Sequence, residues 1–135
     1  MPSVAVRDDN YRGIYQPFSA DLFAATGDAV SNVTLAGART GHTIFVRYLI
    51  IVITTSAAQS ITVYDNAGTP RTIAVLPNSS AVGAHVFDFG EEGVALTEGQ
   101  LLRVNQSAAG NAFALHVEGY YRQTAVLTPA QLASA

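Results

Sequence analysis

The chain has 135 residues, the size of a single domain, and 49% of them are hydrophobic whereas only 13% are charged, about half of the usual globular share. It contains no cysteine, which excludes disulfides, thiolate metal ligands and a cysteine nucleophile. Its net charge of −3, with no lysine at all, gives no cationic footprint for a nucleic-acid backbone, so we expect no nucleic-acid partner.

The first 28 residues show neither the period of a strand nor that of a helix. Asp8 and Asp9 stand where a secretory signal peptide would carry an apolar run, so we expect synthesis in the cytoplasm. Four aromatic side chains in an irregular stretch would gain little in solvent. We therefore predict an extended N-terminal arm that docks on this domain or on a neighbour through Tyr11, Tyr15, Phe18 and Phe23.

From residue 29 to residue 122, β-branched and alternating apolar runs recur between turn signals, at the spacing of a sandwich or barrel. No helical window of similar strength interrupts them, which favours antiparallel pairing. We predict an all-β antiparallel sandwich of about seven or eight strands, with a jelly roll as the first choice. The expected strands are 29–35, 43–55, 60–65, 71–76, 84–89, 94–96, 101–106 and 112–122.

Most of these runs have one apolar face and one polar face. In the run 112–122, Phe113 and Leu115 point one way while His116 and Glu118 point the other, so we expect the first pair in the core and the second pair in solvent. The same alternation in the neighbouring runs indicates sheets that are wet on one side.

The run 43–55 is apolar on both faces. An antiparallel sandwich normally leaves one side of each sheet in water, so the second face requires a cover. The chain's own N-terminal segment or another subunit can provide it, and Tyr48 is our contact candidate there. Strict alternation gives the two faces as Phe45, Leu49, Ile51 and Ile53 on one side, and Ile44, Val46, Tyr48, Ile50 and Val52 on the other.

The remaining organisation is simple. The longest apolar run, 44–53, contains Arg47 and has about half of the length needed to span a bilayer, so we predict no membrane segment. Thr128 and Pro129 allow one frayed helical turn near the C-terminus. We therefore divide the chain into an arm (1–28), a β-sandwich domain (29–122) and a C-terminal tail (123–135).

No motif for catalysis or for a cofactor is present. His42, His85 and His116 are far apart in sequence, and the His-x-His pair of the cupins is missing. The acidic run 88–92 could hold Ca²⁺, although a solvated loop is the commoner outcome. Neither a G-x-S-x-G elbow nor a nucleotide-binding glycine motif occurs. We therefore predict no enzyme, no metal and no cofactor, with convergence of ligands from distant strands as the remaining route to an active site.

Three segments, TIFVRYLIIVITT, ITVYDNAG and LLRVNQSAAGNAFALHVEGYY, resemble the strands of the jelly-roll cement or decoration proteins of tailed-phage capsids. The resemblance implies a virion protein, made in the host cytoplasm, that binds the outer surface of the major capsid protein lattice and cements neighbouring subunits. It also implies a homo-oligomer such as a dimer or trimer, no catalytic residues, and a short-tailed phage of a GC-rich host such as Bordetella.

A second hypothesis is a carbohydrate- or receptor-binding module of a phage tail or of a bacterial surface apparatus. Sandwiches of this size bind glycans through exposed aromatic platforms beside polar loops. Tyr120 and Tyr121 are the platform candidates. Exposure of these two rings would favour this hypothesis over the capsid protein.

Overall fold

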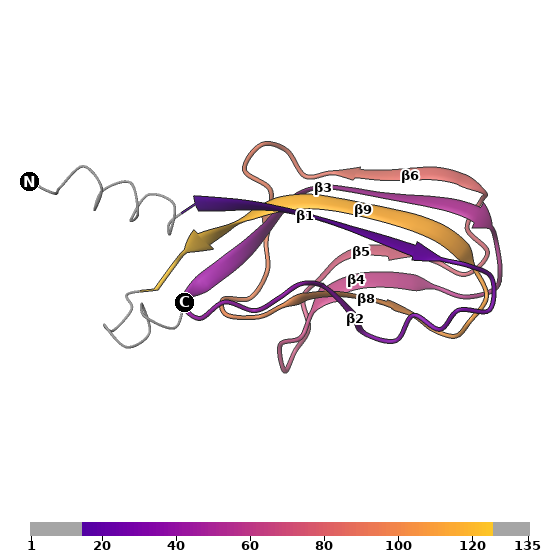
Figure 1. The fold of residues 1–135 in the computed structure, drawn as a ribbon, viewed down its shortest axis with the longest axis horizontal. Coiled ribbons are helices and arrows are strands. Elements are labelled where there is room, and N and C mark those ends of the chain that lie inside the picture. Colours follow the sequence, from indigo (N-terminus) through magenta and orange to yellow (C-terminus); the bar gives the residue numbers. More distant parts are fainter. Residues whose placement is uncertain (1–14, 126–135) are drawn as a thin grey trace, which may run out of the picture.

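Two antiparallel β-sheets lie face to face in the computed structural model, which describes residues 15–125 (Figure 1). The five-stranded sheet has the order β1-β9-β3-β6, with β7 also paired to β3, and the four-stranded sheet has the order β2-β8-β4-β5. The described residues contain no helix, and so none that could cross a membrane. The strands are β1 (Tyr15–Ala24), β2 (Val33–Ala36), β3 (His42–Thr55), β4 (Ile61–Asp65), β5 (Thr72–Leu76), β6 (Gly83–Asp88), β7 (Val94–Ala95), β8 (Leu102–Gln106) and β9 (Ala112–Gln123).

The strand order is that of a jelly roll. Strand β1 pairs with β9, β2 with β8, β3 with β6 and β7, and β4 with β5, so the chain runs as one long hairpin that is folded over into two layers. The predicted all-β antiparallel sandwich is confirmed. Each of the eight expected runs overlaps one strand, from β2 to β9, and the ends differ by up to four residues.

The core lies between the two sheets, where the inward faces of the strands meet. Apolar residues at every second position of β4, β8 and β9 are buried, because successive side chains of a strand point to opposite sides. The largest fully buried side chains are Phe113, Ile44, Leu49, Ile51, Ile53, Ile61, Leu102 and Leu115.

Strand β1 differs from the sequence expectation, because residues 15–24 were placed in the arm. They pair with β9 along their whole length, and Phe18, Ala20 and Leu22 pack against the core. The alternation is weak in the sequence because alanines occupy two of the inward positions and Pro17 is atypical of a strand interior. Pro17 is tolerated because β1 is an edge strand. Tyr11 and the Thr128–Pro129 turn lie outside the described residues.

Strand β3 contains a β-bulge at Arg47. Val46 is opposite Gly119 and Tyr48 is opposite Glu118, so Arg47 is an additional residue without a partner position on β9. The bulge reverses the alternation, and Ile44 and Val46 become 1% and 0% exposed. The prediction that Ile44 and Val46 share a face with Tyr48 is therefore wrong. Phe45 takes their place on the outer side.

Gly119 makes this bulge possible. A Cβ atom at Gly119 would lie 2.0 Å from the carbonyl oxygen of Phe45 and 2.9 Å from the Cε1 atom of Phe18. Both distances are shorter than any contact that a methyl group can make, and the nearer atom belongs to the backbone. The close approach of β3 to β9 at this point therefore requires glycine.

A buried carboxylate ties three connections together. Asp65 is 0% exposed, and its Oδ1 accepts hydrogen bonds from the backbone N–H groups of Ala67 and Arg71, while its Oδ2 accepts one from Thr97. Burial alone would raise the pKa of Asp65. The hydrogen bonds that its carboxylate accepts from Arg71, Thr97 and Ala67 have a larger combined effect in the opposite direction, so the pKa of Asp65 lies below its usual value. Asp65 is therefore an ionised structural group.

Candidate functional site

The two sheets present outer faces of different chemistry. On the four-stranded sheet, Thr62 lies beside Asn105 and Tyr64 lies beside Arg103, whose guanidinium stacks on the Tyr64 ring at 4.5 Å. Val75 is a single exposed apolar residue on this side. This face has the composition of an ordinary solvated surface.

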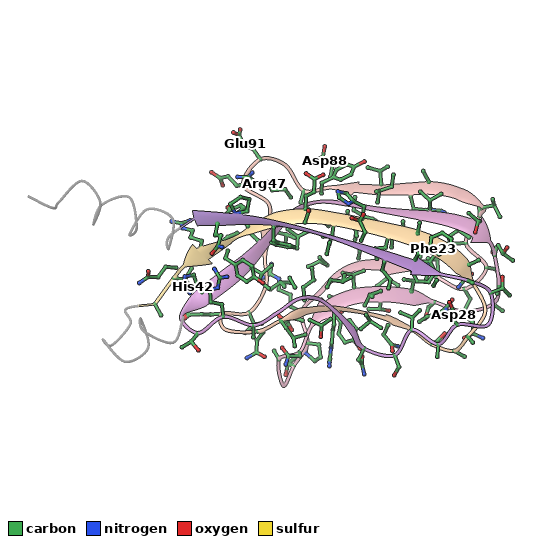
Figure 2. The ribbon with its side chains drawn as sticks, viewed as in Figure 1. Phe23, Asp28, His42, Arg47, Asp88 and Glu91 are labelled. Carbon is green, nitrogen blue, oxygen red and sulfur yellow. The ribbon has the colours of Figure 1, made fainter. Side chains whose placement is uncertain are left out.

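The opposite face, on the five-stranded sheet, carries apolar side chains in rows across four strands. Phe23 is 76% exposed and Val86 is 54% exposed, and they lie on the two opposite edge strands of this sheet, β1 and β6. Figure 2 shows Phe23 near the end of β1. We call three rows the outer face: Phe23–Ala114–Val52–Ala84, Asp21–His116–Ile50–Val86, and Ser19–Glu118–Tyr48–Asp88.

A shallow hollow of about 370 Å³ lies in the apolar part of this face. Its walls are Phe23 on one side and Ile50 and Val52 on the other, and Ala114 lies between them. The hollow exists because the alanine side chain is short where its neighbours across the strands are long. It can accept one apolar side chain from a partner surface.

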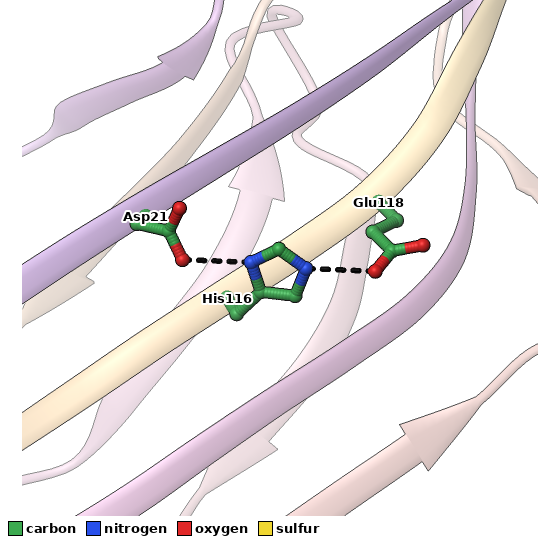
Figure 3. Close-up of polar contacts among 3 residues, drawn as sticks. All are labelled: Asp21, His116 and Glu118. Carbon is green, nitrogen blue, oxygen red and sulfur yellow. Dashed lines mark hydrogen bonds and ion pairs between the residues drawn. The ribbon is translucent and has the colours of Figure 1, made fainter.

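A chain of two hydrogen bonds borders the hollow (Figure 3). The Nδ1 of His116 lies 2.7 Å from Asp21 Oδ1, and its Nε2 lies 2.8 Å from Glu118 Oε2. Ionised carboxylates only accept hydrogen bonds, so His116 can donate to both of them at once only when both ring nitrogens carry a proton, as in an imidazolium. The hydrogen bonds to Glu118 and Asp21 raise the pKa of His116 above its usual value, against a smaller lowering by desolvation.

An aromatic cluster lies near the β-bulge of this sheet, where Phe45 of β3 is opposite Tyr120 of β9. The rings of Tyr120 and Phe45 stack with their centroids 4.9 Å apart, and the guanidinium of Arg47 lies 4.5 Å from the centre of the Tyr120 ring. Tyr120 also donates a hydrogen bond to the carbonyl of Glu92. Tyr120 and Tyr121 are only 6% and 9% exposed, so neither ring offers the open surface that a sugar platform requires.

The five predicted contact residues separate into different places. Phe23 and Tyr48 both lie on the outer face, but in its first and third rows and on strands separated by β9. Phe18 points inward, and its ring centroid lies 5.6 Å from that of Tyr121 in the core. Tyr15 begins β1 opposite Arg122, and Tyr11 lies outside the described residues. The structure therefore places two of the five on one sheet face, without contact between them.

Sequence reasoning placed His116 and Glu118 on one exposed face, and the structure agrees. It missed Asp21, which is 95 residues from His116 along the chain and belongs to the unrecognised strand β1. Only a strand assignment for residues 15–24 could have indicated Asp21 from the sequence, because in a strand Asp21 and Phe23 point to the same side of the sheet.

The histidines and carboxylates do not form a metal centre. Within residues 15–125 no group of three or more His, Asp or Glu side chains has an arrangement that could hold a metal ion. In the acidic run, Asp88 accepts a hydrogen bond from the N–H of Gly90, which closes the turn. Figure 2 shows Asp88 and Glu91 pointing away from the sheet. His42 and His85 each donate to a carbonyl oxygen, of Thr40 and Ala81 respectively.

The chain matches no family model, and no curated protein sequence matches it. Its fold is similar to a chain in the acidic stable capsid structure of the Helicobacter pylori bacteriophage KHP30, with a TM-score of 0.50 and 12% identity over 84% of this chain and 97% of that chain. A structure of turnip yellow mosaic virus is also similar, with a TM-score of 0.42 and 15% identity over 85% of this chain and 82% of that chain. The resemblance to capsid-associated jelly-roll proteins is confirmed at the level of the fold.

Proposed function

We propose that this chain is a structural virion protein that binds the outer surface of a phage capsid lattice and cements neighbouring major capsid protein subunits. In this proposal its partners are the major capsid protein and copies of itself, and it has no enzymatic activity. The observation that carries the proposal is the outer face, where exposed Phe23 and Val86 and an apolar hollow lie beside charged side chains. The jelly-roll fold, which also occurs in the KHP30 capsid structure, supports a virion role.

The energetics suit a protein that is present in many copies. Covering a large apolar side chain such as Phe23 or Ile50 contributes roughly 1.5–3 kcal/mol each. Ordering and association costs consume much of such a gain, so a single contact of this size is weak. A protein that touches several subunits of a lattice at once gains avidity from many weak contacts, which is the requirement for cementing.

The arm hypothesis survives in a reduced form. Residues 15–24 belong to the sheet, so deletion of residues 1–20 would remove half of β1 and damage the sandwich. We propose Tyr11 and Tyr15 as contacts of an N-terminal segment, in addition to Phe23 and Tyr48 on the outer face. Deletion of residues 1–14 removes Tyr11 but leaves β1 complete, with Tyr15 at its start, so it tests Tyr11 separately from the outer face.

Binding to capsid shells tests the proposal. The probe is a shell assembled from the major capsid protein of the same genome, mixed with the full chain and sedimented. We expect the unmodified chain to co-sediment and Phe23→Ala to bind about tenfold more weakly. The matched control is Val75→Ala, which removes an exposed apolar side chain from the other sheet and should bind normally.

Two results would contradict this proposal in different ways. If the unmodified chain does not bind the shells at any concentration or pH tested, the cementing role is wrong. If Phe23→Ala and Val75→Ala bind equally well, the chain binds the lattice but through a different surface.

A further inference from the structure

We propose that His116 is a protonation switch for docking: the outer face binds an apolar protein surface while the ring is an imidazolium, and binds it more weakly once the ring is neutral. The inference rests on the proposed function, because it concerns the same face and the same partner. It adds control of docking by pH to the proposed function.

The position of His116 makes it part of any contact on this face. His116 lies in the row beside Ala114, next to the hollow between Phe23 and Ile50. A partner side chain that fills the hollow must therefore also cover His116 and Asp21, which line it. The side chain of Asp21 is 79% exposed in the free chain, so filling the hollow moves a solvated carboxylate out of water. Glu118, which is 57% exposed, does not line the hollow but is hydrogen-bonded to the same ring at its border.

The proton on His116 decides how costly this transfer is. With an imidazolium between them, Asp21 and Glu118 each keep one charge-assisted hydrogen bond, and the three groups carry a net charge of −1. A neutral ring has one N–H only, so one nitrogen lone pair then points at a carboxylate oxygen less than 3 Å away. The group carries a charge of −2 with one carboxylate unpaired, and burying it is strongly unfavourable.

The charged groups around His116 come from all four main strands of the sheet. Asp21 is on β1, Glu118 on β9, Arg47 on β3 and Asp88 on β6. Arg47 lines a groove of about 480 Å³ together with His116 and Glu118. An arginine stays charged, and ordinary carboxylates stay ionised, throughout the range from about pH 6 to about pH 9. His116 is thus the group on this face whose charge changes in that range.

Thermodynamic linkage fixes the shape of the pH dependence. If docking favours the imidazolium, docking also raises the pKa of His116, by reciprocity. The affinity is then constant below the pKa of the free chain and falls by up to about tenfold for each pH unit above it. It becomes constant again above the pKa of the docked chain, and complex formation between the two values takes up protons.

The experiment measures binding of the full chain to the same capsid shells from about pH 6 to about pH 9. We expect the affinity of the unmodified chain to fall at least about tenfold over this range. His116→Gln should bind weakly with no pH dependence, because glutamine cannot supply a positive charge. The double variant Asp21→Asn with Glu118→Gln should bind tightly at the upper end of this range, where the unmodified chain binds weakly, because it has no carboxylates to bury there.

The matched control is His85→Gln, which removes a histidine on the inward side of β6 and should keep the full pH dependence. Pairwise comparison with His116→Gln separates the switch from general titration of the protein.

The inference is overturned if the unmodified chain binds equally well across the range, or if His116→Gln keeps the pH dependence. It is also overturned if NMR titration of the free chain finds the ring of His116 titrating at or below the usual histidine pKa. Binding that is tight but independent of pH leaves the cementing role intact and removes only the switch. Absence of binding by every variant at every pH removes both.

Discussion

Replacement of Gly119 by alanine is the sharpest test of the fold, because the structure fixes the size of the clash. The new Cβ would lie 2.0 Å from the Phe45 carbonyl oxygen, more than about 1 Å inside the normal contact distance. Phe45 cannot give way by rotating a side chain, since the obstructing atom belongs to the backbone of β3. The central strands β3 and β9 must therefore separate locally and lose hydrogen bonds and ring stacking near the bulge.

We expect Gly119→Ala to lower the free energy of unfolding by about 3 kcal/mol or more, at the upper end of overpacking effects. For a domain of this size the midpoint of thermal unfolding should fall by roughly 10 °C. Circular dichroism at increasing temperature and urea concentration measures both quantities. The control is Gly68→Ala, whose Cβ would meet nothing within 4 Å. If the two variants unfold at the same midpoint, our account of the bulge is wrong.

Three further predictions concern stability. Asp65→Asn should cost about 2–3 kcal/mol near neutral pH, because an amide N–H₂ would face a backbone N–H donor. Urea unfolding should show this cost shrinking as the pH falls below 3.8, because the unfolded chain then takes up a proton at Asp65 while the lowered pKa keeps the folded carboxylate ionised to lower pH. His116→Gln should lower the free energy of unfolding by less than about 1 kcal/mol below pH 6.5, because the variant loses the ion pairs with Glu118 and Asp21. The difference between variant and unmodified protein should vanish as the pH rises through the raised pKa of His116, and a difference in urea midpoints that does not change with pH would show that these ion pairs do not stabilise the fold. Tyr121→Phe should cost about 1 kcal/mol, because the hydroxyl donates a hydrogen bond to the Gly37 carbonyl, and an unchanged urea midpoint would assign that bond no net value.

The sequence predicts most of the sandwich because its strands β4, β8 and β9 alternate cleanly between buried and exposed positions. It does not predict the bulge in β3, because a run that is apolar at nearly every position looks the same when it is shifted by one residue. Ile44 and Val46 could therefore not be assigned to a side without knowing that Arg47 is the additional residue of the bulge. The glycine at 119 that permits the bulge is informative only when its partner strand is known.

The candidate site is harder to predict for a related reason. Phe23 was chosen as an aromatic in an irregular arm, and Tyr48 as part of a two-sided apolar strand; the structure brings them to one sheet through β1 and β3. Phe18 looked equivalent to Phe23 in the sequence, but it occupies the opposite face of the same strand. The pairing of Asp21 with His116 depends on long-range strand order, which local pattern does not encode.

The central place of β9 has a consequence for synthesis. Strand β9 is the last strand of the described residues, yet it lies between β1, the first strand, and β3. As the chain leaves the ribosome, β1 and β3 are made early and have no common neighbour until β9 emerges. The five-stranded sheet is then completed in one late step that closes loops of about a hundred residues, which is slow by nature. Newly made copies therefore acquire their outer face only after nearly the whole described chain has been translated.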